Sequence, residues 1–319
     1  MARPVILETD WYTDCDDVMA ARVLCNLHKR GIFQILACMI NARFDESVRS
    51  LDAFLLDDGI DVPVGIVQEW VHEKKAEPTY QTRLARMRSK YADNNAAENP
   101  LKLYRHLLAA SPEKVDIISI GFAENLAELL ESQPDEFSPL SGAELISQKV
   151  SRLWMMAGRF DVPEGKEYNL RGSTGTSKVI TESGSKVCAN WPTPITFLGW
   201  EIGNAVVSGT HLPENDILRM AMVDHGSAKG RYSWDPLTVL LAAANSPAAA
   251  GYTSVRGYVS SAPDTGVNTF RQDDNGPHEY VVFAHEPEFY VKQVDAWLAK
   301  DGPDESLLCG LPNTISIPK

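Results

Sequence analysis

The chain has 319 residues, of which 44% are hydrophobic, enough for one large domain or two ordinary domains with a substantial core. Its 43 acidic and 30 basic side chains give a formal net charge of −13, which disfavours nucleic acid and anionic membranes as partners. No apolar run reaches the roughly 18 residues of a membrane helix, and acidic residues follow the N-terminus too soon for a secretory signal. The five cysteines have no CxxC spacing, so we expect a reduced, cytoplasmic protein without a disulfide framework or zinc site.

Apolar runs alternate with helical periodicity along most of the chain. We expect strands at 4–9, 33–40, 62–67, 114–121, 150–158 and 194–202. We expect helices at 16–31, 45–59, 79–91, 123–132 and 235–244, the first two closed by Gly31 and Gly59 and the last capped by Asp235. This order favours one α/β domain over 1–319, with a mostly parallel, Rossmann-like central sheet and helices on both faces. The stretches 71–100 and 203–234 are predicted to be lids or insertions on it.

Polar clusters follow most of the predicted strands. They are "ETDWYTDCDD" at 8–17, Asn41, "QEW" at 68–70, "GFAEN" at 121–125 and "MAGRF" at 156–160. Open parallel sheets bind their ligands at the carboxyl ends of the strands, so the sequence predicts a single site along this edge.

The stretch 8–17 contains one glutamate and four aspartates. A helix N-terminus explains Asp16 and Asp17, since each carboxylate there gains about 0.3–1 kcal/mol from the helix dipole. It does not explain Asp10 and Asp14, and crowding like charges costs more than capping returns. A hard cation such as Ca²⁺, which takes about six to eight oxygen ligands, would neutralise the cluster.

Other acidic motifs fit this stretch poorly. An EF-hand loop needs oxygen ligands at alternate positions followed by glycine, and neither Asp10 nor Asp14 begins such a pattern. A phosphatase of the aspartyl-phosphate type would need aspartate and a small hydroxyl where this chain has Glu8 and Tyr12. The run "GSTGTS" at 172–177 lacks the lysine spacing of a P-loop and is expected to be an ordinary loop.

The acidic stretch resembles the N-terminal signature of the inosine–uridine-preferring nucleoside hydrolases, D-x-D-x-G-x-D-x-D-D-A. It has Glu8 for the first aspartate, Tyr12 for the glycine and Val18 for the alanine. "VPVGIV", "IGFAENLAELL", "MMAG", "EYN" and "WDPLTVLLAAA" are similar, in order, to the family's third strand, G-P-L-T-N-L, M-G-G, E-F-N and H-D-P-L-x-V-A, over roughly residues 4–245. The resemblance implies the nucleoside hydrolase fold and Ca²⁺-dependent hydrolysis of ribonucleosides to base and ribose.

The resemblance also implies roles for the matched acidic residues. Asp10, Asp17 and Asp235 would be side-chain ligands of Ca²⁺, together with the main-chain carbonyl of Glu124. Asp10 would also act as general base toward a calcium-bound water, because the metal lowers the pKa of that water. Asp14 has a place in the longer signature and is given a supporting role.

A second set of matched residues would bind the substrate. By resemblance, Asp16 and Asn41 hold the ribose hydroxyls, Glu167 and Asn169 hold the 5′-hydroxyl, and Met156 lines the sugar pocket. Carboxylates near the ring suit this chemistry, since breaking an N-riboside bond builds positive charge on the sugar. Glu167 would also repel a 5′-phosphate, which favours unphosphorylated nucleosides.

Trp234 stands where much of the family has a histidine that protonates the leaving base, and an indole cannot act as that acid. Purine-preferring members with tryptophan at this position stack the base between two indoles, and the second here would be Trp70. A face-on indole favours a cationic ring, so a stacked purine could take its proton from solvent. Both tryptophans could instead be packing residues, and the alternative acids are His72, His225 and Tyr232.

We therefore expect an N-ribosyl hydrolase of the EC 3.2.2 type that favours purine nucleosides, as in purine salvage, and forms the homodimers or homotetramers typical of the family. A non-catalytic protein that binds ribose or nucleosides remains the alternative, because Glu8, Tyr12 and Glu124 depart from the family pattern. A hydrolase of another N-riboside is also open. Trp11, inside the signature, could pack under the site or face the ligand.

Overall fold

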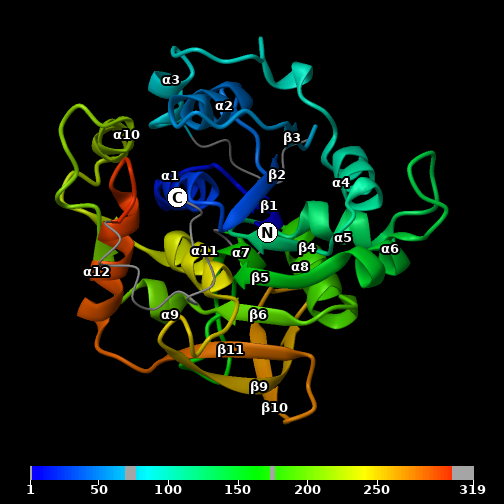
Figure 1. Cartoon of the computed structure of the whole chain (residues 1–319). Coiled ribbons are helices and arrows are strands. Elements are labelled where there is room, and N and C mark those ends of the chain that lie inside the picture. Colours follow the sequence, from blue (N-terminus) through cyan, green and yellow to red (C-terminus); the bar gives the residue numbers. More distant parts are fainter. Residues whose placement is uncertain (1, 69–76, 173–176, 304–319) are drawn as a thin grey trace, which may run out of the picture.

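The strand β1 (Arg3–Thr9) lies inside the sheet that organises the molecule (Figure 1). The computed structural model describes residues 2–68, 77–172 and 177–303. Within these residues the main sheet has nine strands, in the spatial order β10 (Asn268–Gln272), β9 (Tyr252–Ser261), β11 (His278–Phe283), β6 (Ile195–Leu198), β5 (Val150–Met156), β4 (Val115–Ser119), β1, β2 (Phe33–Ile40) and β3 (Val64–Ile66). The strands from β11 to β3 pair in parallel, and β9 is antiparallel to both neighbours. The predicted α/β fold with a mostly parallel central sheet is confirmed.

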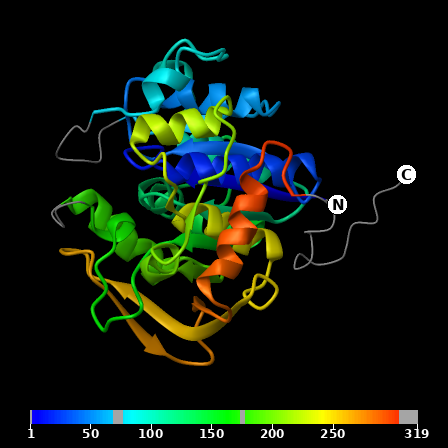
Figure 2. The same ribbon diagram turned by 90° about the vertical axis from the view of Figure 1, so that its left-hand side faces the viewer.

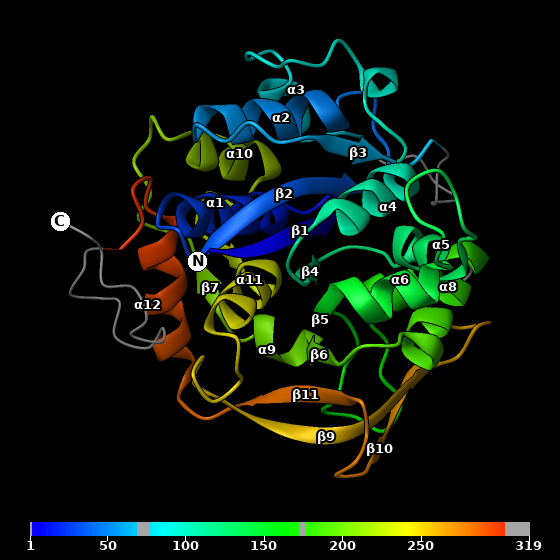
Figure 3. The ribbon, with the colours of Figure 1, turned by 45° about the vertical axis from the view of Figure 1, so that its right-hand side comes forward.

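Helices cover both faces of this sheet (Figure 3). One face carries α1 (Asp16–Lys29), α2 (Ser47–Asp57), α10 (Ile217–His225), α11 (Trp234–Ala244) and α12 (Pro287–Leu298). The other carries α4 (Pro100–Ala110), α5 (Glu124–Glu131), α6 (Gly142–Lys149) and α8 (Lys178–Asn190). Alternate residues of β1 serve the two cores, with Val5 and Leu7 on the first face and Ile6 on the second.

Shorter elements lie in the connections. They are α3 (Gln81–Leu84), the 3₁₀ turn η1 (Asn94–Ala96), α7 (Tyr168–Arg171), α9 (Trp200–Gly203), and the two-stranded antiparallel pair β7 (Val207–Ser208) and β8 (Arg231–Tyr232). The described residues after 245, for which the sequence analysis predicts no element, form β9, β10, β11 and α12 (Figure 2). They lengthen the sheet beyond β6 and end it in an antiparallel hairpin.

Two predicted helix ends are confirmed. Gly31 follows α1 with φ +68° and Gly59 follows α2 with φ +77°, in the left-handed region that glycine adopts without strain.

The helix expected at 79–91 is wrong in its extent, because α3 covers only Gln81–Leu84. The Arg49 guanidinium, which projects from α2, donates to the carbonyl oxygens of Ala85 (3.1 Å) and Tyr91 (2.8 Å). The Ala85 carbonyl, which would accept a hydrogen bond inside the predicted helix, is thus bonded to α2, and the chain follows an irregular path along it.

The strand expected at 194–202 is also shorter than predicted. β6 ends at Leu198, and the chain then turns into α9, whose first N–H group, that of Trp200, donates to the Gly158 carbonyl (2.8 Å). This contact with the loop after β5 draws Trp200 out of the sheet.

The expected insertion at 203–234 contains β7, α10 and β8, and it is tied to the core by charge. The buried guanidinium of Arg22 on α1 donates to both oxygens of Asp216 (2.9 and 3.0 Å), the residue that caps α10. At the other end of α10, Asp224 pairs with Arg83 of α3. The two stretches predicted as lids therefore contact each other.

No helix within 2–68, 77–172 and 177–303 combines the length and apolarity needed to cross a membrane. Cys15, Cys25, Cys38 and Cys188 are buried and free, and Cys309 lies outside the described residues.

His278 gives a test of the fold at the start of β11. Its Nδ1 accepts the N–H of Val259 (2.9 Å), and burial lowers the pKa of the imidazole to about 4. A lowered pKa means that protonation favours the unfolded chain, so this contribution to stability is present above about pH 6.5 and is lost toward pH 4. We expect the difference in unfolding free energy between the wild type and His278→Gln to fall by about 2 kcal/mol from pH 7 to 4.5 in urea titrations. A constant difference would contradict this assignment.

Candidate functional site

A cavity of about 210 Å³ opens at the carboxyl ends of the central strands. Three kinds of side chain line it. The carboxylates are Asp10, Asp14, Asp16, Asp17 and Asp235. Met156 at the end of β5 and Glu167 and Asn169 in the loop after it are the polar and sulfur-containing groups, and the aromatic rings are Tyr168, Trp200 and Trp234. Thr13 and Ile120 complete the lining.

The turn from β1 to α1 brings the acidic residues together. Trp11 has φ +44°, which is rare for a bulky residue, and its N–H donates to Thr9 Oγ1 (3.0 Å) and Asp17 Oδ1 (3.2 Å). The Tyr12 N–H donates to Asp10 Oδ1 (3.3 Å), and the Thr9 hydroxyl donates to Asp17. The strand end is thereby folded back onto the start of the helix.

The two aromatic residues of this turn face the protein interior. The buried Trp11 indole donates to Ser50 Oγ (2.8 Å), and its ring meets Tyr80 edge-on with 5.6 Å between ring centres. Tyr12 is buried and stacks on Phe44, with ring centres 4.6 Å apart. Neither side chain lines the cavity, so Trp11 packs under the site.

Four carboxylates form the floor of the cavity. Ligand oxygens of Asp16, Asp17 and Asp235 lie within 4.8 Å of one another, all buried, and Asp10 adjoins Asp17. Burial raises the pKa of all four carboxyls, that of Asp10 to about 7, and their mutual repulsion adds to the effect. The N-cap position of α11 is occupied by Ser233, and Asp235 lies inside the first turn, so the prediction that Asp235 caps this helix is wrong.

This donor set fits a hard divalent cation. The groups are carboxylate oxygens, which Ca²⁺ and Mg²⁺ prefer, and they meet inside a cavity rather than at a solvated helix end. A cation would replace their repulsion with attraction.

Glu167 and Asn169 are held by the main chain of the loop that follows β5. The Glu167 carboxylate accepts the N–H groups of Gly158 (3.0 Å) and Asn169 (2.8 Å), and burial raises its pKa to about 7 although these bonds oppose the shift. The Asn169 amide donates to the Met156 carbonyl (2.9 Å). All three predicted residues therefore line the cavity in fixed positions.

Trp234 lies against a glycine that leaves room for it. A Cβ atom at Gly203 would lie 2.2 Å from the Trp234 ring, so only glycine fits there. The Trp234 indole N–H donates to the Trp200 carbonyl (2.7 Å), which leaves the ring face as its contact with a ligand.

The sequence prediction missed Trp200 and Tyr168 as cavity residues. Trp200 was assigned to the strand 194–202, although a carboxyl strand end was the signal that could have found it. Its ring is braced by the Arg159 guanidinium, 4.5 Å from the ring centre. Tyr168 lies within the matched "EYN" and is 36% exposed, so it stands at the mouth of the cavity.

Two predicted site residues do not line the cavity. The Asn41 amide donates to Glu8 Oε1 (2.7 Å) and the Phe122 carbonyl (2.9 Å), and its oxygen accepts the Phe122 N–H (3.1 Å). Glu124 begins α5, and neither of its buried carboxylate oxygens has a hydrogen-bond partner among the described residues. Burial raises its pKa to about 8. Trp70 and His72 lie outside the described residues.

Glu8, which departs from the family signature, belongs to a buried polar network behind the cavity. Its carboxylate accepts hydrogen bonds from Tyr104 (2.7 Å), Asn125 (2.6 Å) and Asn41. Burial raises its pKa to about 8. The substitution therefore changes the support of the loops rather than the cavity lining.

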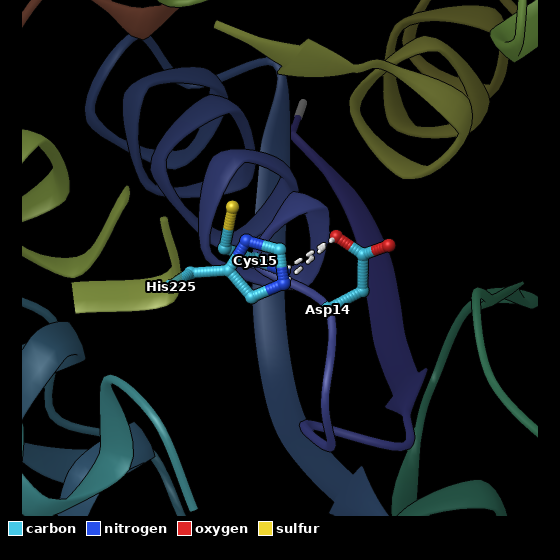
Figure 4. Close-up of side chains that lie close together, drawn as sticks. All are labelled: Asp14, Cys15 and His225. Carbon is cyan, nitrogen blue, oxygen red and sulfur yellow. Dashed lines mark hydrogen bonds and ion pairs between the residues drawn. The ribbon is translucent and has the colours of Figure 1, made fainter. Parts of the chain in front are cut away.

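Asp14, Cys15 and His225 come together beside the cavity (Figure 4). His225 Nε2 lies 3.9 Å from Asp14 Oδ1, and burial raises the pKa of the Cys15 thiol. Arg231 donates to both Asp14 oxygens, through Nε at 2.7 Å to Oδ1. Asp14 is thus held in an ion pair with Arg231. Neither His225 nor Tyr232, two of the proposed acids, lines the cavity.

The fold matches those of solved structures over more than nine-tenths of the chain. The inosine-uridine preferring nucleoside hydrolase from Bacillus anthracis superposes with a TM-score of 0.66 at 15% identity, over 93% of this chain and 99% of that one. An inosine-guanosine nucleoside hydrolase gives 0.62 at 14%, over 93% and 99%, and the type III effector XopQ, complexed with adenosine diphosphate ribose, gives 0.62 at 15%, over 94% and 93%. No family profile and no curated protein sequence matches the chain. The chain has the nucleoside hydrolase fold, as the sequence resemblance predicted.

The carboxylate cluster makes a prediction about stability. In EDTA, Asp17→Asn should raise the free energy of unfolding by about 1 kcal/mol, because it removes a charge from a repulsive cluster yet keeps an oxygen for the Thr9 and Trp11 donors. With Ca²⁺ at a hundredfold excess over Kd, the wild type should gain about 2.7 kcal/mol and the variant much less. Thermal and denaturant melts measure both effects.

Asp264→Asn removes the same charge from an exposed loop and is the matched control. We expect it to leave both quantities unchanged. A destabilised Asp17→Asn apoprotein that keeps the full calcium response would contradict the cluster's role.

Proposed function

We propose that this protein is a metal-dependent hydrolase of N-ribosides that releases the base and ribose. The observation that carries the proposal is the set of four buried carboxylates on the floor of a cavity whose other walls are polar and aromatic. Such a floor suits a reaction in which positive charge develops on a sugar ring. The fold that the chain shares with solved nucleoside hydrolases, at about 15% identity, supports the same activity.

The metal in this proposal is Ca²⁺. Asp10, Asp17 and Asp235 would hold it, with the main-chain carbonyl of Glu124 as a further ligand by resemblance. When bound, the cation neutralises the cluster and lowers the pKa of water in its coordination shell.

The protein's own groups then divide the work. Asp10 adjoins Asp17 on the cavity floor, where it would take a proton from a water that the cation has made more acidic. Asp16 would hold the sugar diol, while Glu167 and Asn169 would hold the 5′-hydroxyl from positions fixed by the main chain. Holding both ends of the ring contributes to the rate by orientation. Asn41, predicted to hold the ribose, would act by positioning the loop at Phe122, to which its amide is bonded.

The aromatic wall supports a preference for purines. Trp234 offers its ring face, since its N–H is bonded to Trp200, and an indole face stabilises a base that is becoming cationic. Trp200 and Tyr168 extend this wall, and Trp70 remains the second stacking partner of the proposal. We also propose that the segments 71–100 and 203–234 cover the site and that the protein is a homodimer or homotetramer.

A panel of nucleosides tests the activity. With Ca²⁺ present, we expect release of base from inosine, guanosine and adenosine faster than from uridine and cytidine, and loss of release after chelation. Chromatography of the free base measures it. A protein that binds Ca²⁺ and nucleoside yet cleaves none of the five would favour the alternative, a non-catalytic nucleoside-binding protein.

Trp234 is tested by two substitutions. Trp234→Ala should lower kcat on inosine by about 10²-fold, because the base loses the ring face that eases its protonation, and should change KM far less. Trp234→Phe keeps a ring face and should stay within about tenfold of the wild type. Steady-state kinetics separate the two constants. Equal losses in both variants would assign Trp234 to packing.

A further inference from the structure

We infer that Arg231 is a positioning residue that keeps the carboxylate of Asp14 out of the coordination sphere of the divalent cation. The inference rests on the metal site of the proposed function. It adds that the chain limits its own ligand set, so that the cation is held by fewer carboxylates than the cavity contains.

Asp14 lines the same cavity as the four floor carboxylates. It precedes Asp16 by two residues, and its charge acts on Asp10, Asp16, Asp17 and Asp235. With a free side chain it would be a fifth candidate ligand. Carboxylates reach Ca²⁺ readily in flexible geometry, so the place of Asp14 in the cavity lining would favour its recruitment.

Arg231 occupies both oxygens of Asp14. Its Nε donates to Oδ1 (2.7 Å) and its terminal nitrogen to Oδ2, the two-pronged geometry in which guanidinium and carboxylate match. The side chains are 26% and 31% exposed, so the pair is partly sheltered from water. An oxygen held in this way is less available to a cation.

The guanidinium is itself held in place. It lies 5.4 Å from the ring centre of Trp234 and 5.3 Å from that of Tyr232. Its backbone belongs to β8, which pairs with β7 through Ser208. Two rings and a strand pair therefore fix the direction in which Arg231 points, and a lysine could not reproduce this flat, forked contact.

The consequence concerns charge and open coordination positions. The three carboxylates that would hold the divalent cation already exceed its charge. A fourth, from Asp14, would tighten binding while occupying a position needed for water or sugar hydroxyls. Calcium sites tune their affinity by the number of charged ligands, so removal of Arg231 should strengthen metal binding. A merely structural role of Arg231 predicts the opposite sign.

Calorimetric titration with Ca²⁺ tests this sign. We expect Arg231→Met to bind Ca²⁺ about tenfold more tightly than the wild type, from one added charged ligand, and the double variant Asp14→Asn/Arg231→Met to return to within about threefold of it. Arg231→Lys keeps the charge but not the forked contact, so its affinity for Ca²⁺ should lie between those of the wild type and Arg231→Met. It replaces Arg231→Met in the test if that variant folds poorly. Unchanged or weaker binding in both single variants would overturn the inference.

Arg152→Met is the charge-matched control. Arg152 is 25% exposed and bonded to Glu279 (2.6 Å), at the far end of β5 from Met156. Removing this arginine changes the net charge equally, so tighter binding in this variant as well would assign the effect to net charge and overturn the inference.

Terbium luminescence counts the coordinated waters directly. With Tb³⁺ in place of Ca²⁺, lifetimes in H₂O and D₂O should show about one water fewer in Arg231→Met, and the wild-type number in the double variant. An equal number of coordinated waters in the wild type and Arg231→Met would overturn this inference and leave the metal site of the proposed function standing. Absence of both Ca²⁺ and Tb³⁺ binding in the wild type would instead overturn the metal site, and the inference with it.

Discussion

Repulsion among buried carboxylates is the constraint on which the rest of this structure depends. Asp10, Asp16 and Asp17 follow β1, and Asp235 comes from a helix more than two hundred residues later. Holding them together opposes folding, so the surrounding packing must supply the balance. This packing consists of a hydrophobic core on each face of the sheet, in which β1 has a neighbouring strand on both sides.

The loops at the carboxyl edge of the sheet are held by contacts that each join two separate elements. Trp11 fixes the loop after β1 to α2 through Ser50. Gly203 makes space for Trp234, whose indole N–H then fixes α9. The Arg22–Asp216 pair anchors the segment from which Arg231 reaches Asp14. Buried polar contacts of this kind contribute little net stability, and their effect is to select one arrangement of the loops.

Sequence reasoning found those cavity residues whose evidence is local. The carboxylates after β1, the "EYN" motif and the Trp-Asp pair that begins α11 are signalled by spacing within a few residues. The Arg231–Asp14 pair joins residues 217 positions apart, and no local pattern indicates it. Trp200 was missed because the hydrophobic run around it is typical of a strand. In the structure its N–H donates to the loop after β5, and the strand ends at Leu198. The helix at 79–91 failed likewise, since Arg49 competes for the Ala85 carbonyl.

The left-handed turn at Trp11 has a consequence for how the site comes apart. The signature that this stretch resembles has glycine at the position of Tyr12, whereas here the neighbouring Trp11 indole packs in the core between α2 and Tyr80. Such a backbone conformation costs roughly 1–3 kcal/mol and persists only while its surroundings impose it. Loosening of α2 would therefore free the loop to relax, and the chelating geometry would be lost while the sheet is still intact. The binding site and one helix on the face of the sheet form a single cooperative unit.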